Sequence, residues 1–123
     1  MNTPRVVTAD DMPRTEVKAG EATDMQVLIG SDHAPHFAMR RFTMAPGGSM
    51  PTHTNTVEHE QFVLTGAADV GIDGETYRVK AGDVVFIPAG SPHWYRSVGE
   101  EPFSFLCLVP NQEDRIDLVP EGC

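Results

Sequence analysis

Three histidines, His53, His59 and His93, are the residues of this sequence whose type and setting best support chemistry. His53 and His59 follow the turn-forming run Pro46-Gly47-Gly48, and His93 ends a second Gly- and Pro-bounded run that begins at Gly82. Neutral imidazole binds most first-row transition metals. Three imidazoles presented from short strands can surround one ion and leave positions open for water or substrate. We therefore expect a shared metal site.

Strand periodicity determines which neighbours accompany these histidines. Side chains two residues apart in a strand point to the same face, so Asn55 should point with His53 and Gln61 with His59. Gln61 would there hold a substrate oxygen or orient the imidazole, unless it is a glutamine at the cavity mouth that touches only water. Glu60 should turn outward. Asn55 either coordinates the ion, binds a metal-bound water, or points away, and the residues leave these alternatives open.

Short apolar segments separated by Gly and Pro turns indicate an all-β chain. The first core strand is expected at Met25 to Ile29, and the next at Phe37 to Met44, ending at Pro46-Gly47-Gly48. Ile72-Asp73-Gly74-Glu75 predicts a tight hairpin, because Asp-Gly supplies positive φ angles. Many short antiparallel strands must close into a barrel or pack as two sheets to protect their edges.

Three regions follow from this pattern. Residues 1–24 are expected to form an N-terminal arm with one short strand near Thr15 to Lys18, residues 25–110 a β-barrel, and residues 111–123 a charged surface tail. A chain of 123 residues with 40% hydrophobic and 22% charged residues suits one globular domain.

Composition argues against several partners and compartments. The formal net charge of -9 disfavours nucleic acid and anionic membranes. No apolar run approaches the ~20 residues that span a bilayer, and the start lacks a signal-peptide core, so we expect a cytoplasmic protein. A disulfide between Cys107, in an apolar run, and the terminal Cys123 is not expected.

The two histidine-bearing segments resemble the two signature motifs of the cupin superfamily. The first motif has the form G-x5-H-x-H-x3,4-E-x6-G, and Gly47, His53 and Gly66 match it. Its acidic ligand falls at His59, and its second histidine falls at Asn55. The second motif, G-x5-P-x-G-x2-H-x3-N, is matched from Gly82 through Pro88 and Gly90 to His93, with Ser97 in place of Asn.

This resemblance implies a double-stranded β-helix, the cupin or jelly-roll barrel. The run Glu58-His59-Glu60 resembles small single-domain cupins whose metal site is all histidine, here with one histidine replaced by Asn55. Such proteins bind manganese or other divalent metals and have been linked to oxidative carbon–carbon cleavage. The implied ligands are His53, Asn55, His59 and His93, around Mn or Fe, with Zn, Ni and Cu as further candidates. Small cupins also usually form homodimers.

Other residues are assigned to the pocket by alternation. Arg40 alternates with Phe42, so it reaches the cavity and pairs with an anion, or else it lies on the surface. Trp94 and Tyr95 point to opposite faces, so only one of them lines the cavity, and we assign Trp94 to it. Gln61 and Arg40 are the candidate catalytic residues, and the candidate pocket walls are Phe42, Trp94, Phe105 and Cys107.

The leading hypothesis is a metal-dependent cupin of the dioxygenase kind that acts on a small substrate. Neutral ligands leave the full charge on the ion, which favours an anionic substrate. One alternative is a sensor or binding module without turnover, and another is metal-assisted isomerase or lyase chemistry without oxygen.

Overall fold

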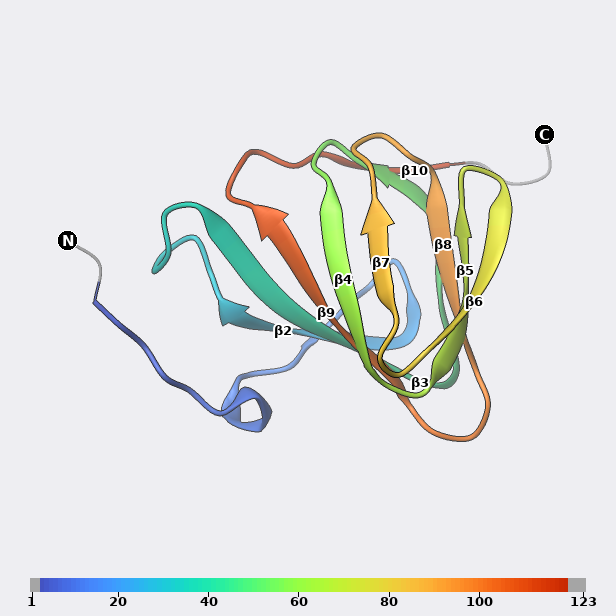
Figure 1. Cartoon of the computed structure of the whole chain (residues 1–123), viewed down its shortest axis with the longest axis horizontal. Coiled ribbons are helices and arrows are strands. Elements are labelled where there is room, and N and C mark those ends of the chain that lie inside the picture. The colour runs from blue at the N-terminus through green and yellow to red at the C-terminus, as the bar shows by residue number, and fades with distance from the viewer. Residues whose placement is uncertain (1–2, 120–123) are drawn as a thin grey trace.

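The computed structural model describes residues 3–119 and is built almost wholly of β-strands (Figure 1). The strands are β1 (Thr15–Glu16), β2 (Glu21–Ile29), β3 (Phe37–Asn55), β4 (His59–Thr65), β5 (Ala67–Ile72), β6 (Glu75–Lys80), β7 (Val84–Ile87), β8 (His93–Val98), β9 (Phe103–Pro110) and β10 (Ile116–Leu118). The short 3-10 turn η1 (Ala9–Asp11) precedes them. The predicted all-β class is confirmed.

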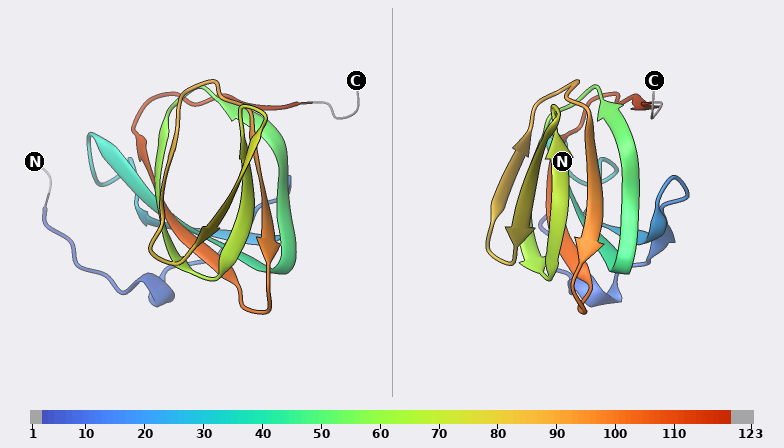
Figure 2. Two further views of the ribbon diagram at one scale, coloured as in Figure 1. Left: turned by 45° about the vertical axis from the view of Figure 1, so that its right-hand side comes forward. Right: turned by 90° about the vertical axis from the view of Figure 1, so that its right-hand side faces the viewer.

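The strands form one antiparallel sheet that curls into two facing layers. Its order is β6-β5-β8-β3-β9-β4-β7, with β2 and β10 also paired to β3. The first half of β3 pairs with β2 and β9, and its second half pairs with β8 and β10. Figure 2 shows how the curled sheet encloses an interior between these layers. One long strand therefore links both layers.

Strand β3 is much longer than the sequence pattern predicts. The expected end of the strand at Pro46-Gly47-Gly48 is wrong, because β3 continues through these residues to Asn55. Gly47 adopts a φ of 81°, and a Cβ on Gly48 would lie 2.9 Å from the carbonyl oxygens of Ala45 and Glu21. These glycines let the strand bend and change layers without losing its pairing.

The predicted hairpin at Ile72 to Glu75 is confirmed. Ile72 and Glu75 are paired, and the two turn residues Asp73 and Gly74 have φ values of 51° and 84°. Both positive angles match the primed turn that suits the twist of a two-residue hairpin. The hairpin fixes the register of β5, which in turn pairs with β8 and its histidine.

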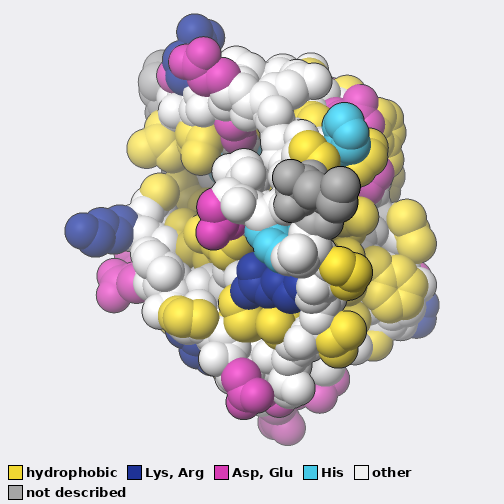
Figure 3. Space-filling view, turned by 90° about the vertical axis from the view of Figure 1, so that its left-hand side faces the viewer, with side chains coloured by type: hydrophobic (Ala, Val, Ile, Leu, Met, Phe, Trp, Pro, Cys, Tyr) yellow, Lys and Arg dark blue, Asp and Glu magenta, His cyan; other side chains and the backbone are white. Residues whose placement is uncertain are grey.

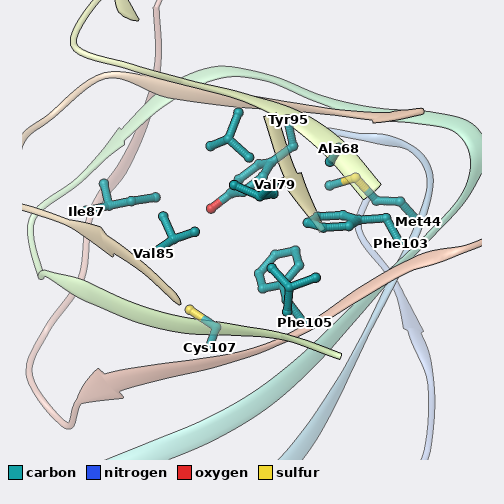
Figure 4. Packing of buried hydrophobic residues seen from close by; sticks show 11 residues of the cluster. Met44, Ala68, Val79, Val85, Ile87, Tyr95, Phe103, Phe105 and Cys107 are labelled. Atoms are coloured by element: carbon teal, nitrogen blue, oxygen red, sulfur yellow. The ribbon is translucent and has the colours of Figure 1, made fainter. Parts of the chain in front are cut away.

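Apolar side chains from both layers fill one end of the interior (Figure 4). The buried cluster comprises Met44, Val63, Ala68, Val70, Val79, Val85, Ile87, Tyr95, Phe103, Phe105 and Cys107. The strands that carry them show alternating burial, as a strand with one face on a core should. This packing holds β4, β8 and β9 rigidly against one another, and these strands carry much of the site described below.

The two chain ends add strands to this framework. The expected N-terminal strand is present as β1, which pairs with β2, whereas β2 begins at Glu21, before the expected Met25. Residues 111–119 are largely exposed, and within this charged tail β10 pairs with the end of β3. None of the described residues forms a helix long and apolar enough to cross a membrane.

The face beside the N-terminal arm exposes several apolar side chains. Val6, Val7, Val27 and Phe37 are all substantially exposed. Figure 3 views this side of the molecule and shows hydrophobic side chains set among charged ones. The arm is held to the sheet by polar contacts: Arg41 binds Asp10 at 2.7 Å. The arm thus exposes the apolar side chains of Val6 and Val7 and is held to the sheet by polar contacts.

Candidate functional site

A partly open cavity of about 280 Å³ lies between the two layers, and part of the apolar cluster, including Tyr95, Phe105 and Cys107, lines it. All four candidate metal ligands and both candidate catalytic residues line it. They are His53, Asn55, His59, His93, Gln61 and Arg40. The six polar residues predicted for the site thus line one cavity. Their chemical roles stay predictions.

Three strands supply these polar residues by alternation. Strand β3 contributes His53 and Asn55 at its end, β4 begins with His59, and β8 begins with His93. All four side chains are buried. The outward residue Glu60 is exposed, as expected. The backbone register therefore places four potential donors at one end of the interior.

Two of the imidazoles are held in one tautomer by backbone carbonyls. Nδ1 of His53 lies 2.8 Å from the carbonyl oxygen of Pro51, and Nδ1 of His93 lies 2.9 Å from that of Ser91. A carbonyl oxygen can only accept, so each Nδ1 carries the proton and donates it. Each Nε2 then keeps a free lone pair, as in histidines oriented for metal binding.

Burial keeps two imidazoles neutral at physiological pH. Burial lowers the pKa of His93 to about 4. The pKa of His59 also falls to about 4, first through burial and then through the nearby positive charge of Arg40. Within the described residues, Nε2 of His59 and Nε2 of His93 are buried without a hydrogen-bond partner. Neutral rings with unpartnered nitrogens are suited to ligation.

Asn55 points its oxygen inward, because its amide group is held from outside. The Nδ2 group donates to Asp114 at 3.0 Å, and the same carboxylate accepts the backbone N–H of Thr56 at 2.9 Å. A carboxylate only accepts hydrogen bonds, so the NH₂ side of Asn55 must face Asp114. The Oδ1 atom is left buried without a partner in the described part of the chain. The amide orientation therefore favours a donor role.

The three rings are close, but they do not converge on one point. The His93 ring centroid lies 4.2 Å from that of His53 and 5.9 Å from that of His59. Over residues 3–119, no group of three or more His, Cys, Asp or Glu side chains has the geometry of a metal site. A preformed three-histidine centre is thus not found there. The unpartnered Nε2 and Oδ1 atoms fit a divalent metal chemically, and binding one requires the rings to turn.

Three near-parallel, stacked aromatic rings, called the aromatic wall below, lie beside the donors. The rings of Phe42 and Phe105 stack at 5.3 Å, and those of Tyr95 and Phe105 stack at 5.3 Å. The Tyr95 ring also meets His93 edge-on at 5.7 Å. Phe42, Phe105 and Cys107 line the cavity, as the alternation predicts.

The assignment of Trp94 to the pocket is wrong. Trp94 packs on the opposite face of β8, against Gly71 and under the Arg96 guanidinium, while Tyr95 lines the cavity. Because His93 points inward, the residue two positions later must do so too. The same alternation that placed Gln61 could therefore have found Tyr95.

The Tyr95 hydroxyl is turned into the interior (Figure 4), and Gln61 holds it there. Gln61 Nε2 donates to the hydroxyl oxygen at 2.7 Å, so the phenolic proton is free to be donated elsewhere. Burial raises the pKa of Tyr95, which keeps the hydroxyl protonated. The pair thus presents a neutral hydrogen-bond donor next to the histidines.

Residues near the chain ends, which the sequence analysis did not assign to the site, border the same cavity. Residues of β1 and β10 line it, including Ile116 and Leu118, which are 61% and 60% exposed. Ile116 pairs with Asn55 and Leu118 with His53. No periodicity in the short tail indicates this pairing, which depends on tertiary contacts. Cys107 is free and buried, and Cys123 lies outside the described residues.

The family assignment follows from this geometry and from comparison with known proteins. The model of the cupin domain family (Cupin_2) matches residues 40–109, more than half of the chain. The chain belongs to the cupin family. The match covers most of the strands that carry the four candidate ligands and leaves out β1, β2 and β10.

This cupin is similar to proteins with different named activities. The crystal structure of the polyketide cyclase RemF from Streptomyces resistomycificus matches 98% of this chain and 88% of its own, with a TM-score of 0.89 and 28% identity. Polyketide synthase CurC from Streptomyces cyaneus is 27% identical over 99 residues, 80% of this chain and 64% of its own. Quercetin 2,3-dioxygenase from Bacillus subtilis is 43% identical over 51 residues, 41% of this chain and 15% of its own.

This cupin spans about half or less of the length of most curated relatives that it matches. Some relatives are oxidoreductases or decarboxylases by name, and others are cyclases or transferases. These comparisons therefore show the cupin family, and the named activities of the relatives do not agree on one reaction.

Proposed function

We propose that this cupin is an enzyme that cyclises a poly-β-ketone or a related 1,3-dicarbonyl compound. The observation that carries the proposal is the cavity itself, where a stack of near-parallel aromatic rings lies next to a cluster of buried imidazoles. The likeness to a polyketide cyclase over nearly the whole chain supports this choice. A reactive chain needs a surface that shapes it and polar groups that act on its carbonyls.

The residues that would hold a divalent metal are His53, His59 and His93 through Nε2 and Asn55 through Oδ1. Their support is the tautomer held at Pro51 and Ser91, together with the buried, unpartnered donor atoms. When bound there, the metal would act as a Lewis acid that polarises a carbonyl and makes the C–H between two carbonyls more acidic.

The chain's own residues would supply the remaining chemistry. Tyr95 can donate its hydroxyl proton in a hydrogen bond to the ketone oxygen that becomes negatively charged as the new carbon–carbon bond forms. Gln61 holds the Tyr95 oxygen at 2.7 Å and so aims that donor. The raised pKa of Tyr95 favours hydrogen bonding over release of the proton.

The aromatic wall would keep the substrate folded and dry. Phe42, Phe105 and Tyr95 stack into a surface on which a planar, conjugated chain can lie. The neighbouring imidazoles are buried, so a substrate that fills the cavity would displace water from them. Excluding water limits hydrolysis of an activated substrate and strengthens hydrogen bonds to it.

The test follows product mass and oxygen together. The purified protein, loaded in turn with zinc, manganese and iron, is incubated with a synthetic triketone with and without oxygen. An aldol cyclisation keeps the substrate mass, or lowers it by one water if dehydration follows, and consumes no oxygen. His93→Ala should abolish the reaction, and Glu60→Gln, on the exposed side of β4, should not. Cyclisation no faster than with His93→Ala under every metal would overturn the proposal.

A dioxygenase remains the second candidate, for one specific reason. The stretch of 51 residues that is 43% identical to quercetin 2,3-dioxygenase is the strongest local identity to a named enzyme among the relatives described above. The aromatic wall would also accept a planar flavonol-type ring. The same assay separates the two functions, because oxidative cleavage consumes oxygen and adds its atoms to the products.

A further inference from the structure

Arg40 lies at the cavity without any acidic partner. The described ion pairs involve Arg14, Arg41, Arg78, Lys80 and Arg115, and none involves Arg40. Among residues 3–119, its side chain makes one hydrogen bond, a weak one from Nη2 to Cys107 Sγ at 3.6 Å. Its Nε is buried without a partner among residues 3–119. A guanidinium with unused N–H groups in a chain of net charge -9 calls for an anion.

The neighbouring arginine in the same strand does have an acidic partner. Arg41 follows it in β3 and points to the other face. There Arg41 binds Asp10 at 2.7 Å and the side-chain oxygen of Gln26 at 2.8 Å. Arg41 thus holds the arm, whereas the Arg40 guanidinium keeps N–H groups available for a ligand.

The surroundings of Arg40 define the ligand that would fit. Its guanidinium lies 5.2 Å over the Phe42 ring, at the start of the aromatic wall. It borders both the cavity and the open groove beside it. The acidic residue of that groove, Asp114, is already bound to Asn55 and Thr56. An anionic group on Arg40 would therefore sit at the cavity entrance, with an apolar ligand body lying along the rings.

We propose that Arg40 is the subsite for a planar two-oxygen anion, a carboxylate or the enolate of a 1,3-diketone, at one end of a flat apolar ligand. The planar fork of arginine matches two oxygens in one plane, which a lysine ammonium does not. The subsite deepens the proposed function, because it acts in the same cavity and sets the charge and orientation of the substrate. The rest of the ligand would extend along the aromatic rings.

The test uses matched probes on metal-free protein. Binding of 2-naphthoate is compared with that of 2-naphthamide by calorimetry at pH 8, and binding of the benzoylacetone enolate with that of its non-enolisable dimethyl analogue at pH 10, where the diketone is ionised and arginine stays charged. The wild type should prefer the anion of each pair by about tenfold or more. Preference in one pair alone would identify which anion the subsite takes. No preference in either pair would overturn the proposal.

Variants separate Arg40 from general charge effects. Arg40→Gln should remove the preference while keeping the affinity for the neutral probe, which also shows that the pocket is folded. Arg40→Lys should retain only part of it, and the control Arg96→Gln, on the outer face over Trp94, should retain all of it. A preference that survives in Arg40→Gln would refute the subsite. Because no metal is present, this result is independent of whether the cyclase assay succeeds.

Discussion

Replacing Asp114 by alanine should weaken metal binding although Asp114 would not touch the metal. The Asp114 carboxylate accepts the amide of Asn55 at 3.0 Å and the backbone N–H and hydroxyl of Thr56 at 2.9 and 3.2 Å. Without it, the Asn55 side chain is free to turn, and its NH₂ group can take the place of the Oδ1 atom in the cavity. The variant therefore presents a donor hydrogen where a ligand oxygen is needed.

The size of the effect follows from these contacts. Removing a group that orients a ligand typically lowers metal affinity by about 10–100-fold. The loss of fold stability should be smaller, about 1 kcal/mol, because Asp114 is exposed and water can replace part of its hydrogen bonding. The two quantities should thus separate, with metal affinity changing much more than the free energy of unfolding.

Titration calorimetry with Zn²⁺ and Mn²⁺ measures the affinity, and urea denaturation of metal-free protein measures stability. Asp117→Ala is the matched control. Asp117 also lies near the end of the chain, in β10, and its carboxylate forms an ion pair with the exposed Arg115. This variant should leave metal affinity unchanged. Equal affinities of the wild type and Asp114→Ala, or an equal loss in both variants, would refute the orienting role of Asp114.

Three further predictions concern protonation, packing and the hydroxyl donor. Because burial lowers the pKa of His59 and His93 to about 4, the unfolded chain binds their protons first as pH falls. Metal-free protein should therefore lose about 2 kcal/mol per imidazole between roughly pH 6.5 and 4.5 and be insensitive to them above this range; urea denaturation that shows no such slope would contradict it. Gly71→Ala should cost about 1–3 kcal/mol of stability, because the added methyl group would overlap the Trp94 indole; an unchanged urea midpoint would show that the indole moves freely. Tyr95→Phe keeps the ring but removes the donor, so kcat for cyclisation should fall about 100-fold with little change in KM; an unchanged kcat would remove Tyr95 from the mechanism.

Local patterns predicted most of the fold and the donors. The Asp73-Gly74 turn, the strand alternation that turns Gln61 inward and the gathering of the histidines all depend on sequence periods of two residues and on turn chemistry. The prediction that β3 ends at Pro46-Gly47-Gly48 was wrong because tertiary pairing overrides the local pattern there. Gly47 and Gly48 look like a terminator in sequence, but paired strands on both sides carry the chain through the bend.

The remaining parts of the site depend on contacts that no local pattern encodes. The tail residue Asp114 meets Asn55 only because β10 pairs with the end of β3. The missing acidic partner of Arg40 likewise becomes visible only when the whole cavity is assembled. Tyr95 is different, because its inward direction follows from that of His93 and was available from alternation alone.

In the proposed site, imidazoles from three strands hold one divalent ion together with Asn55, next to the aromatic wall. A crystal structure of the metal-loaded protein, with anomalous scattering to identify the ion, tests it most directly. The account predicts about one ion per chain, with Nε2 of His53, His59 and His93 and Oδ1 of Asn55 at roughly 2.0–2.2 Å. A cavity that stays empty after loading, with the three rings in their present positions, would contradict it.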